Sequence, residues 1–94
     1  MPFSFYRYAL GRVLLSQGRV PEALEQFRLS HELDSAYLHP LLSMARIYID
    51  TGAVKDAENI LTKLRHADQG SQHPRTRDID MLEADIRKFA KNQK

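Results

Sequence analysis

The sequence predicts an all-α protein, built as an array of antiparallel helix pairs with two repeats and a C-terminal capping helix. Three observations predict this class. The chain is short, its apolar residues recur at helical spacing, and one pattern of residue types occurs twice. The 94 residues are 43% hydrophobic and 28% charged, which is typical of one small globular domain. We therefore expect residues 1–94 to fold as a single domain.

The repeat emerges when the sequence is shifted against itself by 34 positions. The stretches LSQGRVPEALEQF (15–27) and IDTGAVKDAENIL (49–61) then coincide. The matched pairs are Arg12 with Arg46, Gly18 with Gly52, Val20 with Val54, Ala23 with Ala57 and Asp34 with Asp68. A second shift places His39-Pro40 over His73-Pro74. A period of this length indicates stacked repeats, so we expect repeat 1 at about 4–37, repeat 2 at about 38–71 and a capping helix at about 74–92.

The first unit has helical periodicity on both sides of a glycine. Leu10, Val13 and Leu14 form one apolar stripe, and Gly18 ends the pattern as glycine does in the left-handed position after a helix. Pro21 suits the first turn of the next helix. The apolar residues of that helix are Ala23, Leu24, Phe27 and Leu29.

The second unit repeats this order. Pro40 opens a helix and Gly52 closes it, and a polar loop at about 68–72 leads to Pro74 and a final helix. The apolar positions of these three helices are Leu41, Met44, Ile47 and Tyr48, then Ala57, Ile60, Leu61 and Leu64, then Ile79, Leu82, Ile86 and Phe89. The other side of the final helix is charged, with Asp80, Glu83, Arg87 and Lys88. A terminal helix needs one apolar stripe and one polar face.

These residues resemble the tetratricopeptide repeat (TPR) pattern. The matching residues are Leu10, Gly11, Leu14, Gly18, Ala23 and Phe27 in the first unit, and Met44, Ala45, Tyr48, Gly52, Ala57 and Leu61 in the second. Small residues let two helices approach closely, and Phe27 or Tyr48 fills the adjoining hollow. Two features depart from the family: its early tryptophan is absent, and Ser35 and Gln69 replace its closing proline. The resemblance implies a right-handed superhelical array that acts as a protein-interaction adaptor or scaffold.

In such arrays the first helices of successive units line a concave groove that holds a peptide or helix of a partner. Helical spacing selects Phe5, Tyr8, Arg12 and Ser16, and one unit later His39, Leu42, Arg46 and Asp50. Arg12 and Arg46 on adjacent ridges suit a carboxylate of an acidic partner segment. The alternative is that Arg46 pairs with Asp50 at i+4 and Arg12 is solvated. The family's carboxylate-clamp members carry asparagines in this groove, whereas Ser16 and Ser43 stand here, so binding of chaperone tails is not specifically supported.

An N-terminal aromatic cluster has two interpretations. Phe3, Phe5, Tyr6 and Tyr8 either pack onto Leu10 and the second helix as core, or form an exposed apolar edge. Such an edge would serve a partner, an upstream repeat or a second copy of the chain. Self-association, with the chain as a structural module or a piece of a larger repeat protein, is therefore the alternative to the adaptor function.

Sequence features of other functional classes are weak. The chain has no cysteine and no nucleotide-binding or hydrolase motif, and its four histidines lack the spacing of a metal site. We expect no catalysis, no cofactor and no metal. The basic residues Arg75, Arg77, Arg87, Lys88 and Lys91 alternate with acids, and the net charge is only +2, which argues against a nucleic-acid-binding helical domain.

The chain has no apolar run of the roughly 18 residues that a membrane span needs, so we expect no membrane partner. Its start, MPFSFYRYAL, lacks the basic-then-apolar order of a secretory signal. We expect a cytoplasmic protein, with an exported form as the alternative if a leader has been removed.

Overall fold

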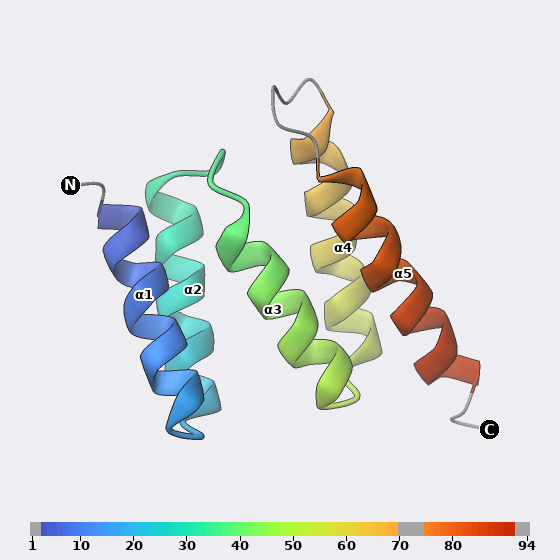
Figure 1. The fold of residues 1–94 in the computed structure, drawn as a ribbon, viewed down its shortest axis with the longest axis horizontal. Helices are drawn as coiled ribbons and strands as arrows, with labels where there is room; N and C mark the ends of the chain where they lie inside the picture. The colour runs from blue at the N-terminus through green and yellow to red at the C-terminus, as the bar shows by residue number, and fades with distance from the viewer. Residues whose placement is uncertain (1–2, 70–74, 92–94) are drawn as a thin grey trace. The chain divides into compact units, whose positions relative to one another are not determined.

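The computed structural model of the protein describes residues 3–69 and 75–91. The described residues form five α-helices and no strand (Figure 1). The helices are α1 (Phe3–Ser16), α2 (Val20–Leu33), α3 (His39–Asp50), α4 (Val54–Asp68) and α5 (Thr76–Lys91). The predicted all-α class is confirmed. Among the described helices, none is long and apolar enough to cross a membrane.

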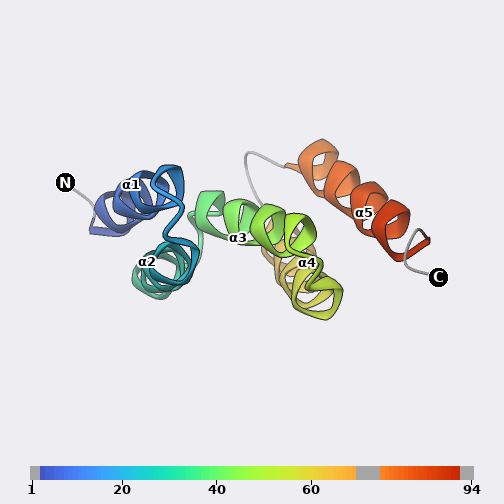
Figure 2. The same cartoon turned by 90° about the horizontal axis from the view of Figure 1, so that it is seen from below.

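The chain divides into two compact units, Met1–Ser43 and Met44–Lys94, and the boundary falls inside α3. The closely packed helix pairs are α1 with α2 in the first unit and α4 with α5 in the second. Two views at right angles show the members of each pair side by side (Figures 1 and 2).

The first unit is held together by small and aromatic residues between α1 and α2. Phe27 and Ala23 on α2 are completely buried, and on α1 the buried residues are Ser4 and Gly11. The hydroxyl of Ser30 donates to the carbonyl of Ser4 at 2.6 Å, which satisfies two polar groups inside this contact. The close approach predicted for Gly11, Ala23 and Phe27 is confirmed.

The apolar stripe predicted for α1 is only partly buried. Leu10 and Leu14 are half-buried, and Val13 is 52% exposed. The reason is that α1 approaches α2 through its smallest residue, Gly11. The larger apolar side chains are thereby turned away from that contact.

Both glycine turns have the predicted left-handed conformation. Gly18 has φ +77° and Gly52 has φ +82°. The amide of Arg19 donates to the carbonyl of Leu14 at 3.0 Å, and Gly18 donates to Leu15. One repeat later Ala53 donates to Tyr48 and Gly52 to Ile49. α1 and α3 therefore end in the same Schellman motif, in which glycine adopts the backbone that other residues rarely tolerate.

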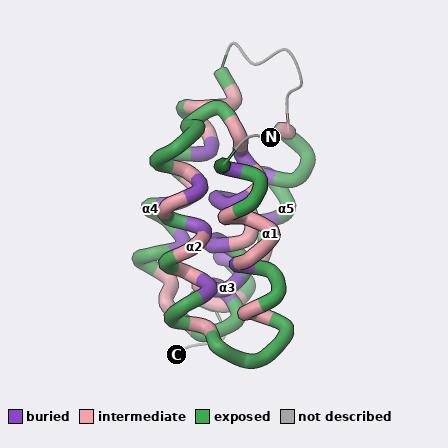
Figure 3. The backbone as a smooth tube through the Cα atoms, turned by 90° about the vertical axis from the view of Figure 1, so that its left-hand side faces the viewer, coloured by how far each residue is buried: buried purple, intermediate pink, exposed green. Residues whose placement is uncertain are grey.

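The second unit buries most of the predicted stripe of α5 and of the predicted faces of α3 and α4, whereas the predicted Tyr48, Leu61 and Phe89 are half-buried. The buried residues of this unit are Met44, Ala45, Ile47, Ile49, Ala57, Ile60, Leu64, Ile79, Leu82 and Ile86. Buried and exposed residues alternate along the helices (Figure 3). The predicted loop begins one residue later than expected, because Asp68 is the last residue of α4. The predicted opening of the final helix at Pro74, and His73 before it, lie outside the described residues.

Candidate partner-binding face

One face of α1 carries the four predicted residues of the first repeat, and we call it the Arg12 face: Phe5, Tyr8, Arg12 and Ser16. Their helical spacing places them in a row along the helix. Phe5 is 46% exposed, Arg12 and Ser16 are exposed, and Tyr8 is half-buried. The hydroxyl of Ser16 donates to the carbonyl of Val13 at 2.7 Å, so this side chain closes the last turn of α1.

Tyr8 is the centre of an aromatic cluster. Its ring centroid lies 5.8 Å from that of Phe27, 5.7 Å from Tyr37 and 5.6 Å from His39. Tyr37 and His39 are themselves 5.2 Å apart. Aromatic pairs at these separations contribute about 0.5–1.5 kcal/mol each beyond area burial. The structure thus brings together two predicted residues of successive repeats, Tyr8 and His39, although the repeat register matches Tyr8 with Leu42 and Phe5 with His39.

Tyr37 was missed by the sequence analysis. It lies between α2 and α3, outside the helical periodicity that selected the other residues. The available signal was an aromatic residue in the short connection between the two helices, two positions before a predicted site residue. Leu42, also predicted, lies on α3 in the same unit and is half-buried.

Arg12 lies over the ring of Tyr8. Its Cζ is 5.9 Å from the ring centroid, and its Nη1 donates to the Tyr8 hydroxyl at 3.4 Å. A cation–π contact at an exposed site contributes about 0.5–1 kcal/mol. Among the described residues no carboxylate pairs with Arg12. The Arg12 side chain is therefore positioned by an aromatic ring, and most of its N–H groups can still donate hydrogen bonds to an anion.

Arg46, unlike Arg12, is paired with carboxylates. It belongs to the second unit, where its Nη2 is 2.7 Å from Oδ2 of Asp85 and its Nη1 is 3.8 Å from Oδ1 of Asp50. The predicted i+4 pair with Asp50 is present, and Asp85 on α5 is the closer partner. Asp85 was missed because it lies 39 positions along the chain, where no local spacing could indicate it. The expected stacking of Arg12 and Arg46 on adjacent ridges spans the two units and stays a prediction.

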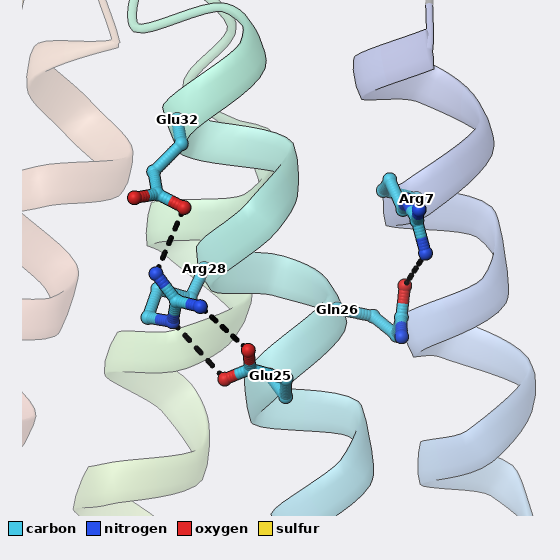
Figure 4. Close-up of polar contacts among 5 residues, drawn as sticks. All are labelled: Arg7, Glu25, Gln26, Arg28 and Glu32. Atoms are coloured by element: carbon cyan, nitrogen blue, oxygen red, sulfur yellow. Dashed lines mark hydrogen bonds and ion pairs between the residues drawn. The ribbon is translucent and has the colours of Figure 1, made fainter.

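The carboxylates of α2 are already engaged by arginines of the same unit. Arg28 donates to Glu25 at 3.0 Å through Nε and to Glu32 at 2.8 Å (Figure 4). The hydrogen bond from Arg28 lowers the pKa of the Glu25 carboxyl. Glu22 pairs with Arg19. Arg7 donates only to the neutral side-chain oxygen of Gln26, at 3.1 Å.

No group of three histidine, aspartate or glutamate side chains lies within reach of a common metal ion in residues 3–69 and 75–91.

The predicted site residues on the Arg12 face combine an exposed cation, a hydroxyl group and aromatic rings. This set suits recognition of a segment with a carboxylate and apolar side chains.

Antiparallel helices closed by identical glycine turns 34 residues apart define the protein as a helical-repeat protein. A family model described as tetratricopeptide repeat matches residues 14–76, and the chain belongs to this family. Searches of curated proteins and of solved structures find no match. Tetratricopeptide repeats are in general protein–protein interaction modules, and their fold is typically non-catalytic.

Proposed function

We propose that the protein is an adaptor that holds an acidic segment of a partner protein on the Arg12 face, beside Tyr37 and His39. One observation carries the proposal. Arg12 is exposed and oriented by the Tyr8 ring, and no carboxylate of the described residues occupies it. A guanidinium in this state can bind a partner carboxylate through two parallel hydrogen bonds.

The apolar part of the recognition comes from Phe5 and Tyr8, which lie on the same face as Arg12. Phe5 offers an exposed ring, and the half-buried ring of Tyr8 is held by its aromatic neighbours. Rigid rings lose little side-chain entropy on binding, which favours such residues at interfaces. In this proposal the protein works as a cytoplasmic scaffold without chemistry of its own.

Residues of the second repeat contribute less in this proposal than those of the first. A partner carboxylate could reach Arg46 only by replacing Asp85 and Asp50, which bind it within the chain. Leu42 and His39 add contact area in the first unit, and Asp50 contributes a negative charge that disfavours acidic residues near it. Binding energy should therefore be concentrated around Arg12.

The test is a display screen of unstructured peptides against the wild-type protein, followed by measurement of Kd for the enriched peptides. We expect enrichment of peptides that combine Asp or Glu with apolar residues. Arg12→Glu should weaken their binding by at least about tenfold, since it replaces an ion pair by a repulsion.

A matched control is Arg77→Glu, which makes the same charge change at an exposed arginine of α5. This variant should bind the enriched peptides within about twofold of the wild type. Equal binding by Arg12→Glu and wild type would show that the Arg12 face is not the site. Folding of both variants is checked by circular dichroism.

A further inference from the structure

A second surface of α1 is apolar and exposed, and we call it the apolar face of α1: Phe3, Tyr6, Leu10, Val13 and Leu14. Phe3 is 74% exposed, Tyr6 56% and Val13 52%, while Leu10 and Leu14 are half-buried. Monomeric soluble proteins rarely expose large contiguous apolar patches, and such patches usually mark interaction sites.

This face is distinct from the Arg12 face. At 100° per residue the two sets point to different sides of α1, and the contact with α2 through Ser4 and Gly11 lies on a third side. α1 therefore has an exposed apolar face in addition to the side that packs on α2. α5 contrasts with α1, because its face opposite the buried stripe carries exposed Asp80, Arg87 and Lys88. The apolar stripe of a helix is normally covered, and its polar face is exposed to solvent.

The spacing of the exposed residues fits a helix as the covering element. Phe3, Tyr6, Leu10 and Val13 follow an i, i+3, i+7, i+10 pattern, which is the seam along which two helices interdigitate. The seam extends over three turns of α1.

Charge at the border of the face indicates what kind of helix would fit. Arg7 flanks the seam, and its partner is the neutral Gln26, while Arg28 engages Glu25 and Glu32 (Figure 4). α1 contains two arginines and no acid. Pairing α1 with α1 of a second copy would bring arginines together with no carboxylate from either helix, which opposes self-association.

We propose that the apolar face of α1 docks an amphipathic helix of a different protein, whose apolar stripe is bordered by Asp or Glu residues that meet Arg7. This site is independent of the Arg12 face. The adaptor would thus hold one partner as an extended acidic segment and a second as a helix.

The test uses a displayed library of helical peptides with randomised stripe and border positions. Clones enriched on the wild-type protein should carry apolar residues at i, i+3 or i+4, and i+7, with Asp or Glu along one border. The double variant Tyr6→Lys, Val13→Lys should bind them at least about tenfold more weakly, because it places charges in the seam. Arg7→Gln should remove the preference for acidic borders, and Arg12→Glu should leave binding within about twofold.

Other outcomes overturn the proposal. No enrichment, or equal binding by the double variant, would show that this face does not dock a helix. A dimer in sedimentation that the double variant abolishes would assign the face to a second copy. Binding to phosphatidylserine-containing vesicles that requires Tyr6 and Val13 would assign it to a lipid surface. If the double variant does not fold, Phe3→Lys alone, at the most exposed position, provides the same comparison.

Discussion

The ring of Phe27 on α2 lies directly against Gly11 on α1. A Cβ atom added at Gly11 would be 2.7 Å from Cε1 and 2.8 Å from Cδ1 of Phe27, closer than carbon atoms pack. Phe27 is completely buried, and its ring centroid lies 5.8 Å from that of Tyr8. This pair determines the face through which α1 meets α2, and hence which side chains of α1 remain exposed.

Gly11→Ala should destabilise the first unit. Alanine gains about 1 kcal/mol of helix propensity over glycine, but overpacking a buried ring costs about 1–3 kcal/mol. We expect the free energy of unfolding to fall by about 1 kcal/mol. Chemical denaturation measures it, with Phe27→Leu as the matched background because leucine lacks the ring atoms that clash. An equal effect in both backgrounds would contradict the proposed clash.

The two turn glycines should differ in their response to alanine. Both Gly18→Ala and Gly52→Ala place a side chain at positive φ, which costs about 1–2 kcal/mol. A Cβ at Gly18 meets nothing within 4 Å, whereas at Gly52 it would be 3.0 Å from Cζ of Phe89. Gly52→Ala should therefore lower the melting temperature more. The difference should disappear in a Phe89→Leu background, and its persistence there would refute the explanation.

Asp68 should stabilise the start of α5 although it lies at the end of α4. Its Oδ1 accepts from the amide of Arg75 at 2.7 Å, and its Oδ2 accepts from the hydroxyl of Thr76 at 2.9 Å. Asp68→Ala should cost about 0.5–2 kcal/mol, as removal of a helix cap does. Asp68→Asn keeps one acceptor and should cost less. Urea unfolding of both variants checks this, and an unchanged midpoint for Asp68→Ala would contradict it.

The Arg46–Asp85 pair should contribute little to stability. The two side chains are 45% and 35% exposed, and ion pairs of this kind contribute about 0–1 kcal/mol. A double-mutant cycle with Arg46→Met and Asp85→Asn should give a coupling in that range at 0.1 M salt and near zero at 1 M. A coupling above about 2 kcal/mol, or one insensitive to salt, would show that the pair is more strongly desolvated than its exposure indicates.

Protonation of Glu25 should depend on Arg28. The hydrogen bond from Arg28 lowers the pKa of the Glu25 carboxyl in the folded protein below its ordinary value. The stabilisation by this pair is therefore present above the unfolded pKa and is lost as the pH falls through the lowered folded pKa. NMR titration should show the Glu25 pKa rising toward its ordinary value in Arg28→Gln and staying unchanged in Arg77→Gln. No rise in Arg28→Gln would exclude Arg28 as the cause.

Local chemistry made much of the fold predictable. The positive φ of Gly18 and Gly52 follows from glycine's lack of a Cβ, and burial of Ala23 and Ala57 follows from side-chain size and helical period. These features depend on residues within one helix pair, and the same residue types occur at the equivalent positions of both repeats.

Other features could not be predicted for physical reasons. The exposure of Val13 could not be predicted, because the sequence of a helix that is apolar on several sides does not show which side packs on its neighbour. The close approach of α1 to α2 at Gly11 determines that side. Of the candidate site, the repeat register predicted the row of residues on α1 and the equivalent row on α3. It did not predict the contact of Tyr8 with His39, because the residue equivalent to Tyr8 is Leu42. The engagement of Arg46 by Asp85 was not predicted either, since tertiary contact alone brings them together.

The position of the boundary between the two units matters for dissecting the protein. Ser43 and Met44 are neighbours within the continuous helix α3. A truncation at this boundary would leave each fragment with about half of a 12-residue helix, and isolated helical segments of so few residues do not hold their structure in water. Fragments meant to isolate either unit should therefore both retain His39–Asp50 in full. Cleavage of a single peptide bond within α3 would therefore disrupt a helix that both units share.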